Sequence, residues 1–351
     1  MNKKKFKPHI LLVPIFNLVL QKDVKREIKI GDVIFVAKEK LPKIRKRLGF
    51  KRRLSELNRQ NPWKENIFEF ASSYAVIKRK LADAKDINEP ISLIREAVWL
   101  LASSQAPSRS YVRYFGLPEH EVNVLNKYVL YDMEEDNYDY FVFRPSSLPL
   151  EPFRLGSQWK HIMTNHFFPL GLKIINNKMK VKKTWQNSIK NAMILIGKSI
   201  FSSDLSQAFL YNMISIETLL TSRGDKFPEQ IINRLNALFY WRFKKDDPKL
   251  WENRIKEIYK LRCEAIHDGE IKNIEVEHLL FSDLLLTNLL YNVCNSTKYI
   301  SRKEDLVKYA RETEARNILK IPQKYPFLIR FSTYWPSEIQ LERIRKRMSW
   351  G

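Results

Sequence analysis

The stretch PKLWENRIKEIYKLRCEAIHDG, residues 248–269, decides the predicted fold of the second half of the chain. Trp251, Ile255 and Ile258 recur at the three- and four-residue spacing of one face of an α-helix. Pro248 suits the first turn of that helix, and Gly269 lies where a left-handed cap would end it. The stretch therefore predicts an amphipathic helix that packs against other helices.

Two polar residues near the end of this helix break its pattern. Arg262 takes the next position of the apolar face, where a guanidinium is costly unless it is paired or lines a cleft. His267 follows five residues later, and histidine is the side chain that ordinarily titrates near neutral pH. Residues five apart on an ideal helix lie about 140° apart around its axis. Arg262 and His267 therefore meet only if the last turn loosens before Gly269, or if a second subunit completes the site.

Apolar stripes in the neighbouring sequence predict an antiparallel helical bundle around this helix. The upstream stripes are Trp185, Ile189, Met193 and Ile196, then Phe209, Met213, Ile216 and Leu220, then Ile231, Leu235 and Leu238. The downstream stretch 274–293 is apolar almost all round, which predicts a helix that is central or at a subunit interface. Glu217 interrupts its stripe as Arg262 interrupts its own, so we expect a buried ion pair between the two.

These residues carry a resemblance to a known family. The pattern Arg262-x4-His267, followed closely by Gly269 and preceded by Ile-Tyr-x-Leu, resembles the signature of HEPN domains. The stretch SIETLLTSRGDKFPEQIINRLNALF, residues 215–239, resembles the earlier part of the Apea-like HEPN group, in which an aliphatic-Glu-x-Leu-Leu helix and a second helix precede the Arg/His helix. The resemblance covers about residues 190–300. One departure is Cys263, because many family members carry a polar residue directly after the Arg.

The resemblance implies a symmetric homodimer in which two such helices form a composite cleft. It implies that Arg262 and His267 are catalytic and that Glu217 and Tyr259 support them. The expected activity is that of an endoribonuclease without metal or cofactor, in which the RNA 2′-OH attacks the neighbouring phosphorus. His267 would act as general base or acid and Arg262 would donate to the phosphoryl oxygens, leaving a 2′,3′-cyclic phosphate.

Family members of this kind are often toxins or abortive-infection effectors against phage, so the implied partners include a phage-derived trigger or a cognate antitoxin. The alternative function is a non-catalytic RNA- or nucleotide-binding HEPN dimer. In that case Arg262 is structural and His267 is a polar residue at a helix end.

Composition limits the function classes. The chain has 351 residues, enough for two domains, and 62 Lys and Arg against 39 Asp and Glu give a net charge of +23. Such a charge predicts an anionic partner, with nucleic acid first and a membrane surface second, although a purely solvating charge is the alternative. With nine glycines there is no Walker-type or GxGxxG phosphate loop. His161 and His166 have no nearby carboxylate or thiol to complete a metal site.

Two further features bear on location. Cys263 and Cys294, the two cysteines, provide no disulfide framework, which favours a reducing cytoplasm. The apolar run 9–20 is interrupted by Pro14 and is too short to span a bilayer, so it predicts a buried strand and no membrane insertion.

Basic residues gather in two places. Each group admits two interpretations, a surface that follows RNA phosphates or a solvated helix face. The candidate RNA-binding residues are Lys43, Arg45, Lys46, Arg47, Lys51, Arg52 and Arg53, and near the C-terminus Arg343, Arg345 and Arg347.

The predicted fold class is α+β. Strands are expected at 10–20, 26–38 and 68–80, a β-hairpin at 128–144, and a helix at 91–101. Residues 1–180 would form a mixed α/β or β-rich domain that senses a signal or presents RNA. Residues 181–300 would form the HEPN-like bundle, and residues 301–351 a basic C-terminal extension. A helix in this extension is predicted to start at Ser337, with Gln340 at capping-box spacing.

Overall fold

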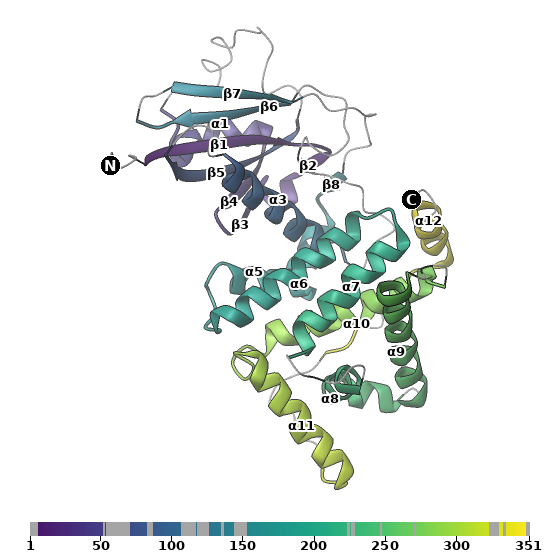
Figure 1. Ribbon diagram of the computed structural model, residues 1–351. Helices are drawn as coiled ribbons and strands as arrows, with labels where there is room; N and C mark the ends of the chain where they lie inside the picture. Colours follow the sequence, from purple (N-terminus) through teal and green to yellow (C-terminus); the bar gives the residue numbers. More distant parts are fainter. Residues whose placement is uncertain are drawn as a thin grey trace. The chain divides into compact units, whose positions relative to one another are not determined.

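The computed structural model describes residues 6–51, 53, 71–82, 87–106, 117, 126–134, 137–143, 153–222, 225, 229–245, 248–269, 271, 273–322, 330–332 and 335–348. It confirms the α+β class, because an antiparallel sheet near the N-terminus is followed by a long run of helices (Figure 1). The chain divides into two compact units, one formed by Met1–Val98 with Arg113–Ile162 and the other by Trp99–Val112 with Met163–Gly351.

Strands of the first unit form an antiparallel sheet in the order β3-β4-β5-β1-β6-β7 within the described residues. Their bounds are β1 Lys7–Ile15, β3 Glu27–Ile30, β4 Val33–Ala37, β5 Ser73–Leu81, β6 Asn126–Asp132 and β7 Asn137–Phe143. The strand β1 pairs with β5 along its whole length, from Lys7 opposite Leu81 to Ile15 opposite Ser73. Because β1 has neighbours on both edges and is buried on both faces, it reads as a nearly unbroken apolar run.

Two predicted strands are in fact broken. The stretch 10–20 ends its pairing in the main sheet at β1, since Asn17 adopts a positive φ of 55°. The following β2 (Leu18–Leu20) pairs instead in parallel with β8 (Phe153–Leu155). The stretch 26–38 is the hairpin β3–β4, with Ile30 opposite Val33. Gly31 is the first of the two turn residues of this hairpin. Its φ is 59°, a conformation that glycine adopts without steric cost.

The helix α1 (Leu41–Leu48) covers one face of the sheet. Its Leu41, Ile44 and Leu48 pack in a cluster with residues of β1, β4 and β5, as the spacing of the three apolar residues predicts. Short 3₁₀ turns precede it at Lys22–Val24 and Lys38–Lys40. The predicted hairpin is β6–β7, and the helix predicted after Pro90 is α3 (Asn88–Ser103), which begins in the first unit and ends in the second.

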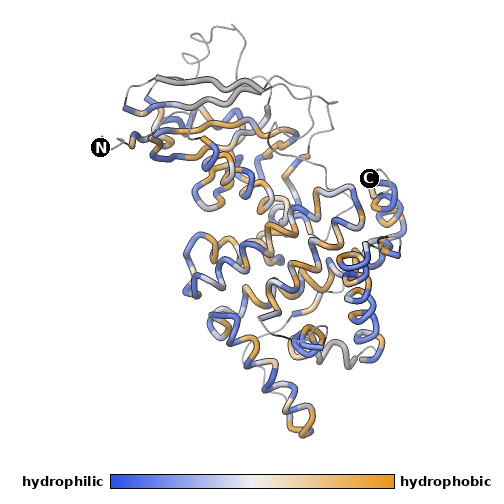
Figure 2. Tube along the Cα trace, viewed as in Figure 1, coloured by the Kyte–Doolittle hydropathy of each residue, from blue (hydrophilic) through white to orange (hydrophobic). Residues whose placement is uncertain are grey.

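The second unit is built of helices. Their bounds are α5 Phe167–Ile175, α6 Lys183–Phe201, α7 Leu205–Leu220, α8 Glu229–Lys245, α9 Pro248–Cys263, α10 Val276–Asn295, α11 Lys303–Ile318 and α12 Glu338–Met348, with α4 Gln158–Asn165 at the junction between the units. The helix α10 contacts α5, α7, α8 and α12 and is buried on nearly all sides, so it is the central helix that its apolar sequence predicts. In Figure 2 the same helix is mainly orange, whereas α12 carries much blue.

Particular contacts join further segments to the second unit. The helical unit takes in residues 163–180 because α5 packs on α6 and α10. It takes in the end of α3 because α6 crosses closely at Gly197, where an added Cβ would lie 1.9 Å from the carbonyl oxygen of Trp99. In the described part of residues 301–351, α11 packs on α8, and α12 buries Leu341 and Ile344. Among the described residues, no helix has the length and apolar content to cross a membrane.

Candidate functional site

The helix α9 places Arg262 as its sequence predicts. Trp251, Ile255 and Ile258 are buried along one face, and Arg262 lies one turn further on with only 17% of its side chain exposed. A half-buried guanidinium needs a partner of opposite charge, because desolvation penalises an unpaired cation. The burial of Arg262 can therefore be interpreted only together with the residue that neutralises its charge.

Glu217 of α7 is that partner. Nε of Arg262 lies 2.8 Å from Oε1 of Glu217, and Nη2 donates a hydrogen bond to Oε2 at 3.0 Å. The Glu217 side chain is 14% exposed. Burial alone would lower the pKa of Arg262, but the hydrogen bond and the charge of Glu217 outweigh it and raise that pKa. The ion pair expected from the sequence is thus formed, and it fixes the guanidinium between α7 and α9.

Tyr259 lies one turn before Arg262 on the same helix. The guanidinium carbon of Arg262 is 5.9 Å from the centre of the Tyr259 ring. Burial, followed by the negative charge of Glu217, raises the pKa of Tyr259 to about 12, so its hydroxyl keeps its proton at neutral pH. The three residues Glu217, Tyr259 and Arg262 are therefore brought together.

The helix loosens directly after this group. Residues Glu264–Asp268 form one π-helical turn, in which backbone hydrogen bonds join residues five apart. Gly269 ends the turn in the left-handed conformation, with φ of 71°, and its N–H donates to the carbonyl of Glu264. His267 lies on this wider turn, so its direction around the axis differs from that in an ideal α-helix.

The side chain of His267 is exposed, and within the described residues it makes no hydrogen bond or ion pair. The loosened turn was one of the two routes by which Arg262 and His267 could meet. Among the described residues no hydrogen bond joins their side chains. Cys263, between them, is a free and partly exposed thiol.

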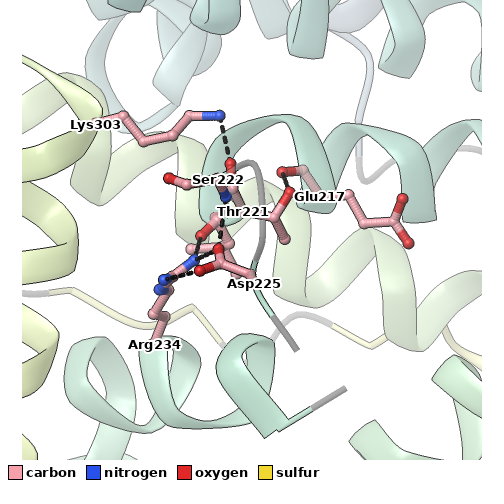
Figure 3. A network of polar contacts seen from close by, with 7 residues as sticks. Glu217, Thr221, Ser222, Asp225, Arg234 and Lys303 are labelled. Atoms are coloured by element: carbon pink, nitrogen blue, oxygen red, sulfur yellow. Dashed lines mark hydrogen bonds and ion pairs between the residues drawn. The ribbon is translucent and has the colours of Figure 1, made fainter. Parts of the chain in front are cut away.

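A second buried arginine supports the end of α7. Arg234 of α8 is only 2% exposed, and its Nη1 and Nη2 lie 2.5 Å and 3.1 Å from the carboxylate of Asp225. It also donates to the carbonyl of Leu220, the last residue of α7. Nζ of Lys303 donates to the carbonyl of Thr221 at 2.7 Å. In Figure 3, Lys303 reaches Thr221 from above, and Arg234 and Asp225 pair below it.

This network satisfies backbone carbonyls at the C-terminal end of α7, the helix that carries Glu217. Carbonyls at a helix C-terminus lack partners within the helix and carry partial negative charge. Two cations, from α8 and α11, satisfy two of them, and the hydroxyl of Thr221 donates to the carbonyl of Glu217 at 2.7 Å. Sequence reasoning missed Arg234, although it lies three residues after Ile231 and four before Leu238, on the stripe that those residues define.

The candidate RNA-binding residues belong to two different units. On α1, Lys43, Lys46 and Arg47 are exposed, although Arg47 pairs with Glu27 of β3. Arg45 donates to the carbonyl of Lys51. Lys51 and Arg53 are exposed, and Arg52 lies outside the described residues.

On α12 the basic residues take part in packing. Nη2 of Arg345 lies 2.7 Å from Oε1 of Glu277 on α10, and Arg347 donates to the carbonyl of Ile200 on α6. Arg343 is exposed. Arg345 and Arg347 thus hold α12 on the bundle, and this occupies donors that the RNA-binding interpretation assigned to phosphate.

No known protein-family model, curated protein or solved structure matches this chain. Within the described residues no three His, Cys, Asp or Glu side chains gather as metal ligands. The fold is that of an α+β protein with a helical bundle. A function must be argued from the contacts of Arg262 and His267.

Proposed function

We propose that the chain is a HEPN endoribonuclease that cleaves RNA without a metal ion. The observation that carries the proposal is the Arg262–Glu217 pair, followed by a π-helical turn that ends in exposed His267. Single π-helical turns occur frequently at functional sites. An α-helical turn at the end of α9 would cost less free energy than a π-helical one. The wider turn therefore supports a role for the residues on it.

RNA supplies its own nucleophile. The 2′-oxygen attacks the adjacent phosphorus, the bond to the 5′-oxygen breaks, and the products carry a 2′,3′-cyclic phosphate and a 5′-hydroxyl. One proton must leave the 2′-OH and one must reach the 5′-oxygen, and a histidine serves either purpose near neutral pH. His267 is the exposed histidine on the helix that carries Arg262.

Arg262 would stabilise the charge that builds on the phosphoryl oxygens. Its contacts with Glu217 use Nε and Nη2, so Nη1 would be the nitrogen that donates to phosphate. Because Glu217 fixes the guanidinium, little side-chain entropy is lost when Nη1 binds phosphate. Tyr259 would hold the guanidinium from its ring face.

A symmetric homodimer would supply both the base and the acid. Two-fold symmetry brings two copies of Arg262 and His267 to one cleft if the ends of the two α9 helices meet. Exposed Ile266 and Ile271 beside His267 support such an interface, since large apolar side chains are exposed there.

The net charge of +23 supports RNA as the partner. The exposed face of α1 would let the N-terminal unit present RNA or sense a signal. We propose that the protein acts in the cytoplasm as a toxin or abortive-infection effector against phage, held inactive until a phage-derived trigger appears or an antitoxin is lost.

A non-catalytic RNA- or nucleotide-binding dimer is the second candidate. The observation that favours it is that two nitrogens of Arg262 already contact Glu217, while the described residues show no hydrogen bond from Arg262 to His267. In that case the loosened turn would serve contact with a ligand and not proton transfer.

Growth after induced expression separates the two candidates. Wild type, His267→Ala and Arg262→Ala are compared with His161→Ala, which removes another exposed helical histidine. We expect wild type and His161→Ala to stop growth and fragment total RNA, and the two site variants to do neither. Equal toxicity of wild type and His267→Ala, with intact RNA, would favour the binding dimer.

A further inference from the structure

Two buried asparagines on α10 hold a distant segment of the chain by its backbone. Asn292 donates from Nδ2 to the carbonyl of Arg330 at 2.7 Å and accepts from the N–H of Arg330 at 2.9 Å. Asn288 donates to the carbonyl of Ser332 at 3.0 Å and accepts from its N–H at 2.7 Å. Asn288 is 4% exposed and Asn292 is 1% exposed. Each amide thus pairs with one whole residue, donor to acceptor and acceptor to donor.

The spacing of the two pairs matches an extended peptide. Four residues of α-helix rise about 6 Å, and two residues of an extended chain span about 6.6 Å. Asn288 and Asn292 are four apart, while Arg330 and Ser332 are two apart, so both pairs form at once. The segment runs antiparallel to α10, since its later residue pairs with the earlier asparagine.

The amides are held ready for this contact by their own helix. Nδ2 of Asn288 also donates to the carbonyl of Leu284, and Nδ2 of Asn292 donates to the carbonyl of Asn288. Each Nδ2 carries two hydrogens. One is donated to a carbonyl of α10, and the other is donated to the segment that contains Arg330 and Ser332. A buried amide whose outward groups lose their partners is destabilising, because those groups have given up water. The α10 face is therefore built to carry a backbone partner.

The residue between the two pairs provides side-chain selectivity. The ring of Phe331 meets Phe239 of α8 at 5.0 Å and Trp251 of α9 at 5.5 Å between ring centres, both edge to face. The guanidinium of Arg330 lies 5.7 Å from the ring of Tyr291. Backbone pairing gives affinity for any extended chain, and an aromatic pocket at alternate positions gives specificity, as in other peptide-binding sites.

We propose that this face of α10 is a binding site for an extended peptide with a central aromatic side chain. Arg330–Ser332, which we call the strap, occupies the site in cis, and a peptide of the same chemistry competes for it in trans. The site does not depend on the proposed ribonuclease activity. Because Trp251 belongs to α9, displacement of the strap removes an aromatic contact from the helix that carries Arg262.

Fluorescence anisotropy of a labelled heptapeptide, LIRFSTY (residues 328–334), tests the site on the full-length chain. A tethered strap acts at a high effective concentration, on the order of millimolar, so wild type should bind the peptide weakly. Phe331→Ala removes the side chain that anchors the strap and leaves the pocket intact. We expect this variant to bind the peptide at least tenfold more tightly than wild type does.

Two controls separate the site from general stickiness. Adding Asn292→Ala to Phe331→Ala should weaken peptide binding at least tenfold, and the peptide LIRASTY should fail to bind either chain. If Phe331→Ala does not fold, Phe331→Leu replaces it, because leucine weakens the strap without emptying the pocket. Equal binding to wild type and the strap variant, or equal binding of both peptides, would overturn the proposal.

Discussion

Removing the carboxylate of Glu217 should destabilise the helical unit, because it leaves Arg262 half-buried and without its partner. Loss of one partner of a fully buried ion pair costs about 3–5 kcal/mol. The side chains of Arg262 and Glu217 keep 17% and 14% of their exposure, so water compensates part of that loss. We therefore expect Glu217→Ala to lower the free energy of unfolding by about 2 kcal/mol, which lies between the buried and surface cases.

Urea unfolding followed by circular dichroism and tryptophan fluorescence measures this effect. With an m value of about 2 kcal/mol per M, the midpoint of the helical transition should fall by about 1 M. A double-mutant cycle of Glu217→Ala and Arg262→Ala isolates the interaction, and we expect a coupling free energy of about 1–2 kcal/mol.

Glu252 and Lys256 provide the matched control on the same helix. Their side chains form an exposed ion pair at 2.6 Å with i,i+4 spacing, for which a coupling of about 0.3–0.5 kcal/mol is usual. A Glu217–Arg262 coupling no larger than that of Glu252–Lys256 would refute the view that α7 and α9 are joined by a buried charge pair.

Three further changes test the surrounding structure. The hydrogen bond from Arg234 holds the pKa of Asp225 below its ordinary value of 3.8, so the stability it adds is present above about pH 4 and is lost as pH falls through the folded pKa. Asp225→Asn should therefore lower the free energy of unfolding by about 3 kcal/mol at pH 7 and by less at pH 3, as measured by urea titration. The same loss at both pH values would contradict this. Gly269→Ala should cost about 1 kcal/mol in melting experiments, and Gly269→Asn less, because only the left-handed backbone is strained. Gly197→Ala should cost about 3 kcal/mol or prevent folding, since its Cβ would lie 1.9 Å from the carbonyl oxygen of Trp99, and a neutral effect in the same assay would contradict the close crossing.

The sequence was informative wherever a period decided which side chains are buried. Trp251, Ile255 and Ile258 could be assigned to one buried face because the helical repeat leaves no other arrangement. The pairing of Arg262 with Glu217 followed from the same logic, since each charge interrupts an apolar stripe and each needs the other.

Features that depend on local backbone geometry could not be predicted in this way. The π-helical turn at Glu264–Asp268 leaves no periodic trace in five residues. The hairpin at Gly31 was missed because residues 26–38 were interpreted as one strand, although Gly31 and Asp32 between two apolar runs are a two-residue turn signal. The two hydrogen bonds between Asn288 and Ser332 join a side-chain amide to backbone groups. Any residue in the strap offers the same backbone groups, so the residue type at 332 does not indicate the contact.

The helix α11 was missed for a different reason. Leu306, Tyr309, Ala310 and Thr313 follow helical spacing and are buried, but charged residues surround them and the stripe is short. It packs on α8, and Asn233 of α8 donates a hydrogen bond to Glu314 at 3.2 Å. Tertiary packing, more than intrinsic propensity, decides whether such a helix forms.

The chemistry at the RNA ends tests the central claim most directly. Purified wild type and His267→Ala are incubated with a short RNA in excess EDTA, and the fragment ends are identified by mass spectrometry. The proposed function predicts 2′,3′-cyclic phosphate and 5′-hydroxyl ends from wild type, at least about 100-fold slower cleavage by His267→Ala, and no cleavage of the all-deoxy strand. Fragments with 5′-phosphate ends, or equal cleavage by wild type and His267→Ala, would contradict it.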